Sequence, residues 1–178
     1  MGILRKLFGK NSETTTDVLE LLSSQHAEVD ALFEAIEQGR GDKRALFTEL
    51  ADKLAAHATV EEKLFYPAVM ANQTEDQLRE AVEEHLAIKR LLADLISLRP
   101  SDDEFDAKLK VLKEQITHHA HKEEEGKLFP KAKSLLSADE RAGLGNEVLV
   151  MFEELMQSHP YQQVPNETAE AAPLPSLR

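Results

Sequence analysis

The fold is predicted from the stretch His57-Ala58-Thr59-Val60-Glu61-Glu62-Lys63-Leu64-Phe65-Tyr66-Pro67. A related stretch runs from His119 through Glu123-Glu124-Glu125 to Leu128-Phe129-Pro130. Each stretch holds a histidine, a glutamate four residues later, and a Leu-Phe pair close to a proline that interrupts or ends a helix. A further histidine precedes each stretch, His26 by 57 − 26 = 31 residues and His85 by 119 − 85 = 34. This order indicates two similar helical hairpins that contribute to one shared centre.

Apolar residues recur at steps of three and four around each of these four histidines, which places each histidine on the apolar face of a helix. The four patterns are Leu22-His26-Val29-Phe33-Ile36, Phe47-Leu50-Leu54-His57-Glu61-Leu64, Leu78-Val82-His85-Ile88-Leu92-Leu95 and Leu109-Leu112-Ile116-His119-Glu123. One histidine on such a face is usually a satisfied core residue. Four imidazoles and two carboxylates in one core are costly unless they are paired or bind metal. The set of four nitrogens and two carboxylates suits two borderline metal ions.

With these residues in view, the chain resembles the hemerythrin-like, or HHE cation-binding, family over about residues 16–157. The matching segments are Leu22–Val29, His57–Pro67, Glu84-His85 and His118-His119 running into Glu123–Pro130. The resemblance implies an up-down four-helix bundle. The residues themselves add to this all-α fold an additional C-terminal helix, which begins at the Ser137/Glu140 capping pair, and flexible termini. The resemblance also implies a non-haem di-iron centre with a bridging oxo or hydroxo group, in which Mn or Zn are alternative metals. The implied terminal ligands are His26, His57, His85 and His119, and the implied bridging carboxylates are Glu61 and Glu123.

The carboxylate of the second stretch has two candidates. Glu123 lies four residues after His119 and fits the helical face, whereas Glu124 lies six residues before Pro130, as Glu61 lies before Pro67. A five-residue spacing from His119 requires a π-bulge, which often occurs at functional sites. The helical pattern favours Glu123, and Glu124 stays a candidate. The neighbouring histidines and glutamates are expected to be outer partners of the ligands or surface groups.

One position departs from the family pattern. Oxygen-carrying members look to have a second histidine on the third helix, where this chain has Lys89, a side chain that can extend to water. This departure favours a centre that binds, senses or reacts with O2, peroxide or NO, or that handles iron, with at most a weak peroxide- or NO-directed activity. The alternative is a metal-stabilised structural or regulatory interaction module without redox chemistry, and a weaker one is a metal-free bundle. No protein partner is indicated.

Composition agrees with a helical domain and narrows the function. The 178 residues carry a formal net charge of −12, which argues against binding nucleic acid or an anionic membrane. The chain has no cysteine, which excludes disulfides, thiolate zinc sites and iron–sulfur clusters. A cytoplasmic location is compatible with that absence and is our expectation. No apolar run is long enough for a transmembrane segment.

The sequence suggests three segments: a short amphipathic or flexible N-terminal segment at 1–13, the bundle at 14–158, and a disordered tail at 159–178 that is rich in Pro, Ala and Glu. Capping signals mark the helix starts inside the bundle. They are Asp42, the Thr74/Gln77 pair and the Ser137/Glu140 pair. Clustered imidazoles also predict that the metal-free protein loses stability as the pH falls through about 6.5.

Overall fold

The computed structural model describes residues 16–177, and every regular element in that range is a helix. The predicted N-terminal segment at 1–13 lies outside the described residues. Among the described helices, none combines the length and the hydropathy that spanning a bilayer requires. The predicted cytoplasmic location stays a prediction.

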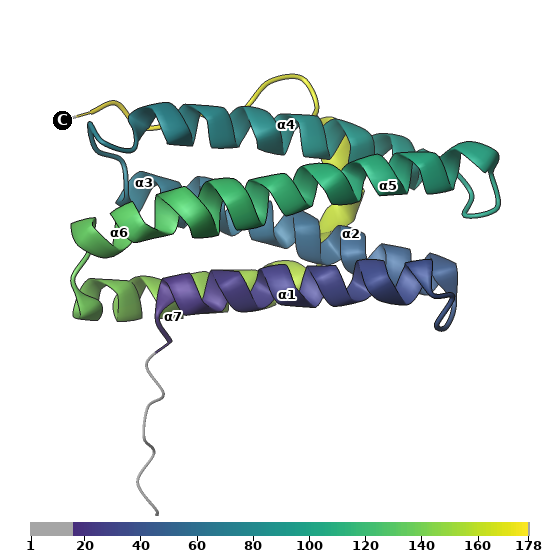
Figure 1. Cartoon of the computed structure of the whole chain (residues 1–178), viewed down its shortest axis with the longest axis horizontal. Coiled ribbons are helices and arrows are strands. Elements are labelled where there is room, and N and C mark those ends of the chain that lie inside the picture. The colour runs from purple at the N-terminus through teal and green to yellow at the C-terminus, as the bar shows by residue number, and fades with distance from the viewer. Residues whose placement is uncertain (1–15, 178) are drawn as a thin grey trace, which may run out of the picture.

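Four long helical rods lie side by side, each antiparallel to the one before it in the chain, and a further helix packs along them (Figure 1). The rods are α1 (Val18–Glu37); α2 (Lys43–Val60) continued by η1 (Glu61–Phe65) and α3 (Tyr66–Ala68); α4 (Glu75–Ser97); and α5 (Asp103–Thr117) continued by η2 (His118–Leu128) and α6 (Phe129–Leu135). The additional helix, α7 (Ala138–Gln157), contacts α1 and α2. The predicted four-helix bundle with a C-terminal fifth helix is confirmed.

The helix starts follow the capping signals with one exception. The Asp42 carboxylate accepts a hydrogen bond from a first-turn amide of α2 at 2.7 Å, and Ser137 and Glu140 form the predicted reciprocal capping box of α7. The capping box predicted at Thr74 is wrong. Its hydroxyl donates to the carbonyl of Val69 at 2.6 Å and so closes the turn between α3 and α4.

The core consists of two apolar clusters with the histidines between them. On α1, Leu22 belongs to one cluster and Val29 to the other, and His26 lies between these two residues. The other three histidines occupy the same place on their rods, because Leu54 and Val60 flank His57 in this way, Val82 and Ile88 flank His85, and Ile116 and Leu128 flank His119. The 3.6-residue period therefore brings one histidine of each rod to the same level of the bundle.

The C-terminal segment corrects the prediction of a disordered tail. Residues Pro160–Asn166 form a short 3-10 helix, η3, which contacts α2 and α4, and Figure 1 shows this yellow segment crossing the bundle. Val164 is buried in the apolar cluster, and the guanidinium of Arg90 donates to the carbonyl of Thr168 at 3.0 Å. The composition predicted disorder because the segment is rich in Pro, Ala and Glu. Buried Val164, the partly buried Tyr161 and Leu174, and tertiary hydrogen bonds nevertheless hold it on the bundle.

We expect Val164→Ala to lower the free energy of unfolding by about 2 kcal/mol, since it removes buried methyl groups and leaves a cavity. The matched control is Val150→Ala on α7, because Val150 is 56% exposed and Val164 only 1%. Urea unfolding of both variants measures the difference. Equal midpoints in the two variants would contradict the packing of this segment.

Candidate metal centre

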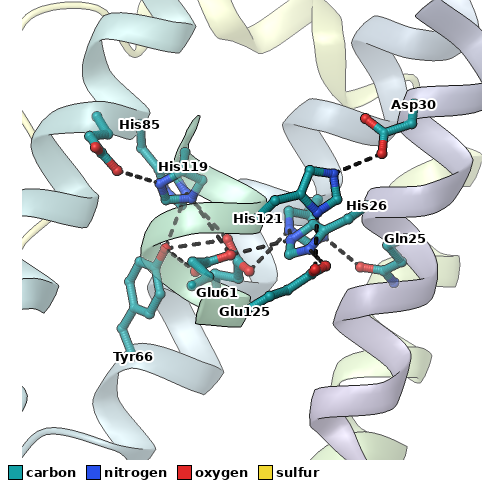
Figure 2. Close-up of polar contacts among 12 residues, drawn as sticks. Gln25, His26, Asp30, Glu61, Tyr66, His85, His119, His121 and Glu125 are labelled. Atoms are coloured by element: carbon teal, nitrogen blue, oxygen red, sulfur yellow. Dashed lines mark hydrogen bonds and ion pairs between the residues drawn. The ribbon is translucent and has the colours of Figure 1, made fainter. Parts of the chain in front are cut away.

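Four buried imidazoles, one from each rod, lie in the middle of the bundle. Their residues are only 3 to 8% exposed. Figure 2 shows three of them, His26, His85 and His119. The Nε2 atoms of His26 and His57 lie 3.0 Å apart, and those of His85 and His119 are also 3.0 Å apart. The histidines predicted from the repeat thus form two pairs, each with its Nε2 atoms directed inward.

Two buried carboxylates connect the two pairs. Glu61 places one oxygen 3.0 Å from Nε2 of His57 and the other 3.2 Å from Nε2 of His85. Glu124 places Oε2 3.2 Å from Nε2 of His26 and 3.7 Å from Nε2 of His119. Ligand atoms of His26, His57, Glu61 and Glu124 all lie within 4.8 Å of one another, as do those of Glu61, His85 and His119. Each carboxylate is therefore placed to bridge two metal positions.

The fourth rod corrects the choice between the two glutamates. Residues His118–Leu128 form a π-helix, whose wider turn brings Glu124, five residues after His119, into the core, where it is 1% exposed. Glu123 instead turns to the outside, where a carboxylate oxygen lies 2.7 Å from Nζ of Lys127 and another contact, at 3.5 Å, joins it to His118. The preference for Glu123 rested on regular α-helical spacing, and the π-helix removes that regularity.

Each inward-facing imidazole has a polar partner on its outer nitrogen, Nδ1. The four pairs, with their distances, are His26–Glu125 (2.7 Å), His57–Gln25 (2.7 Å), His85–Glu62 (2.9 Å) and His119–Glu84 (2.6 Å). An acceptor at Nδ1 fixes the proton there and leaves Nε2 free to bind a metal, which is the usual arrangement of histidine ligands. Glu62 and Glu125 were expected to be outer partners or surface groups, whereas no role was predicted for Gln25 and Glu84, each of which directly precedes a predicted histidine ligand.

Tyr66 is a site residue that the sequence analysis missed. Its buried hydroxyl donates to Oε1 of Glu124 at 2.8 Å and lies 3.2 Å from Nε2 of His85. Burial and the nearby charges of Glu124 and Glu61 raise the pKa of Tyr66 well above its usual value, so the phenol keeps its proton. The signal was present in the repeat, because Tyr66 occupies the position that Phe129 has before the second proline.

Lys89 does not extend into water as expected. It is 9% exposed, and its Nζ lies 2.9 Å from Glu62 and 3.3 Å from Glu167 of the C-terminal segment. Because Glu62 also accepts the outer hydrogen bond of His85, Lys89 takes part in the outer support of the centre.

The charges of the cluster stabilise one another. Burial lowers the pKa of His26, but the hydrogen bond to Glu124 and the charges of Glu124 and Glu61 outweigh it and raise that pKa to about 9. Burial also lowers the pKa of His119, but the charge of Glu124 and hydrogen bonds to two carboxylates outweigh it and raise that pKa to about 10. Burial would raise the pKa of Glu61, but the charge of His57 and hydrogen bonds from histidines hold it well below its usual value. Without metal, the cluster is therefore a network of imidazolium and carboxylate groups.

The polar atoms left over in this network fit a metal. The buried oxygens Glu61 Oε1 and Glu124 Oε2 have close histidine nitrogens, at 3.0 and 3.2 Å, but no hydrogen bond of good geometry. Unsatisfied buried acceptors are destabilising, and two facing Nε2 atoms share at most one proton. Metal ions among these atoms would satisfy both the free lone pairs and the facing nitrogens.

A small apolar cavity lies beside the four imidazoles. Its volume is about 30 Å³, and the six other residues that line it are Val29, Leu54, Ala58, Ile88, Ile116 and Ala120. This volume is close to that of one or two water molecules. A ligand that reaches the imidazoles through this cavity is therefore no larger than a diatomic molecule or peroxide.

Comparisons with known proteins agree with the geometry. The profile of the family described as Hemerythrin HHE cation binding domain matches residues 17–132. A crystal structure of a hemerythrin HHE cation binding domain-containing protein from Mycobacterium kansasii has a TM-score of 0.71 at 24% identity and covers 83% of this chain and 91% of that one, which shows the shared fold.

One curated relative is a protein of Nostoc sp. (strain PCC 7120 / SAG 25.82 / UTEX 2576) described as a DNA nickase, 27% identical over 126 residues. The match covers 70% of this chain but only 36% of that relative, so the chain corresponds to about a third of the longer protein.

Proposed function

Because the chain belongs to the hemerythrin HHE cation-binding family, we propose that its histidine–carboxylate cluster binds two iron ions and that this centre binds, senses or reacts with O2, peroxide or NO. The observation that carries the proposal is the pair of 3.0 Å Nε2–Nε2 contacts joined by shared carboxylates with unsatisfied oxygens. Mn and Zn accept the same ligands, so the choice of iron rests on the family.

In this proposal the protein supplies six ligand side chains. The four histidines would be terminal ligands through Nε2, and Glu61 and Glu124 would each bridge the two ions. These six residues would leave some coordination positions of the two ions open to small ligands. Two iron ions would supply one-electron chemistry and open coordination positions.

The residues around the ligands have separate tasks. The Nδ1 acceptors would hold each imidazole in its metal-binding tautomer. Tyr66 would hold its proton between its own oxygen and Glu124, which fixes the direction of that carboxylate. The apolar cavity would exclude bulk water and admit only small molecules. The net charge of −12 places nucleic-acid binding outside the proposal.

We expect His57→Ala to remove at least about half of the bound metal, since it deletes one terminal ligand and leaves Glu61 without its closest nitrogen. The matched control is His159→Ala, because the His159 side chain is 63% exposed and pairs with Asp52 rather than with a residue of the cluster. Elemental analysis after reconstitution with Fe(II) under anaerobic conditions measures the difference. Equal metal contents in the two variants would refute the site.

We expect Val29→Ile to weaken the binding of cyanide or NO, both diatomic, by about ten-fold or more while metal content is unchanged, because the extra methyl group enters the cavity beside the imidazoles. The control is Val111→Ile, at a position 43% exposed. Ligand titration of the iron-loaded protein, followed by absorption, gives both affinities. A metal-loaded protein that binds neither ligand, before any substitution, would instead support the structural or regulatory module.

A further inference from the structure

The internal repeat extends to the partners of the histidines. The residue after the bridging glutamate supports the opposite hairpin: Glu62 accepts from His85, and Glu125 accepts from His26. The residue before the first histidine of each hairpin also has one role. Gln25 accepts from His57 at 2.7 Å, and its counterpart Glu84 accepts from His119 at 2.6 Å. Ligands and outer partners therefore follow the same approximate two-fold relation.

Within this relation, Gln25 and Glu84 differ in charge. One metal position, between His26 and His57, is supported by a carboxylate and a neutral amide. The other position, between His85 and His119, is supported by two carboxylates. Gln25 is buried, and its amide is the closest partner of the outer nitrogen of His57.

The other two outer carboxylates carry similar basic partners. Nζ of Lys89 lies 2.9 Å from Glu62, and Nδ1 of His121 lies 3.0 Å from Glu125, while the other nitrogen of His121 lies 2.8 Å from Asp30. Each of these two carboxylates shares its charge with a basic group that also contacts a second carboxylate, Glu167 for Lys89 and Asp30 for His121. Glu84 has a basic neighbour too, because Nε2 of the exposed His118 lies 3.6 Å from it, but so long and exposed a contact offsets little of its charge. The substitution of an amide for a carboxylate is then the main electrostatic difference between the outer partners.

A carboxylate that accepts from Nδ1 makes the imidazole a stronger donor at Nε2 than a neutral amide does. The inner ligands do not differ in type, since both positions have two imidazoles and share the same two carboxylates. Oε2 of Glu124 is 3.2 Å from His26 and 3.7 Å from His119. Its other oxygen, Oε1, accepts from the hydroxyl of Tyr66, which lies 3.2 Å from Nε2 of His85, so Oε1 is directed toward the His85/His119 position. Substitutions of Gln25 or Glu84 leave Tyr66 on the His85 side unchanged.

We propose that the two metal positions have unequal affinities, that the position between His85 and His119 fills first, and that Gln25 and Glu84 set this order as positioning residues. The inference rests on the proposed two-metal centre. It adds that the first ion binds between His85 and His119. The ion between His26 and His57 is then the one that is released first.

The test is a titration of the full, metal-free chain with Co(II) against a chromophoric chelator, which resolves the two dissociation constants. We expect them to differ by about 10- to 100-fold in the unchanged protein, the usual effect of an outer partner. Gln25→Glu should bring them to within about a factor of three by tightening the weaker step, and Glu84→Gln should do so by loosening the tighter step.

Two controls carry the same charge changes elsewhere. Gln157→Glu alters an exposed residue at the end of α7, and Glu83→Gln alters the exposed neighbour of Glu84, so both should keep the original ratio. Anomalous diffraction from crystals with one equivalent of Co(II) should place the ion between His85 and His119. If the Gln25→Glu variant does not fold, judged by its melting curve, Glu84→Gln still decides the question.

The outcomes separate the inference from the proposed function. Two equal constants in the unchanged protein, or first loading between His26 and His57, overturn the inference and leave the two-metal centre intact. A ratio that both substitutions leave unchanged also overturns it, because the inequality would then come from repulsion between the ions. A chain that binds no Co(II) and no Fe(II) overturns both.

Discussion

Glu124→Ala is expected to reduce the bound metal from roughly two ions to fewer than about one, while Glu123→Ala leaves it nearly unchanged. Glu124 is buried and lies within 3.7 Å of a histidine from each pair, so its removal deletes the bridge at both positions. It also leaves the hydroxyl of Tyr66 without its closest acceptor. Glu123 pairs with the exposed side chain of Lys127, and such exposed ion pairs contribute little to stability.

Elemental analysis of both reconstituted variants gives the answer, and circular dichroism shows whether each is folded. Metal loss in Glu123→Ala together with full metal content in Glu124→Ala would mean that the fourth rod follows regular α-helical spacing through this region. That result would also remove Glu124 from the centre.

Removal of metal is expected to lower the melting temperature by about 5 to 10 °C, since an ion present at about 100 times its dissociation constant stabilises the native state by about 2.7 kcal/mol. The comparison is between the iron- or Co(II)-loaded protein and the same protein in EDTA. The His57→Ala variant is the control, because EDTA should have little effect on a protein that already lacks most of its metal. Identical melting curves for the loaded and EDTA-treated protein would contradict a metal held in the core.

The metal-free protein is expected to lose stability as the pH rises through about 9 to 10, the pKa values of His26 and His119 in the folded state. These values lie above the histidine value of about 6.5 in the unfolded chain. The folded state therefore binds protons more tightly, and this contribution is complete below about 6.5 and disappears above the folded values. The pKa values of Glu61 and Glu84 are lowered in the folded state. Their contribution to stability is therefore present above about pH 4.5 and is lost as the pH falls below that value.

The expected pH dependence is opposite to the one predicted from the sequence, which was a loss of stability as the pH falls through about 6.5. That prediction considered the imidazoles without their carboxylate partners. Metal binding competes with protons, so the difference in melting temperature between loaded and metal-free protein should widen from about pH 6.5 to about 9.5. Melting curves in EDTA at about pH 5.5, 7.5 and 9.5 test the sign. A metal-free protein that is less stable at the lowest of these pH values than at the middle one would contradict the carboxylate pairing.

Helical periodicity and the internal repeat were enough to predict the bundle and the four histidines that meet in its core. The apolar period of 3.6 residues fixed which face of each rod is buried, and a histidine on that face had to enter the core. The repeated order of His26, His57, His85 and His119 was enough to pair the hairpins. These features depend on residues close together in the chain, where spacing and orientation are linked by helix geometry.

The glutamate of the fourth rod that enters the core could be identified only in the folded bundle. A π-helix differs from an α-helix by one residue in its hydrogen-bond spacing, and the local sequence of Glu123 and Glu124 favours neither clearly. The roles of Gln25 and Glu84 could not be predicted from the sequence either, because each accepts a hydrogen bond from a histidine of another rod. The order of the C-terminal segment depends on Val164 finding a site against α2 and α4. Such contacts join residues far apart in the chain, and their energies arise only when the rods have packed.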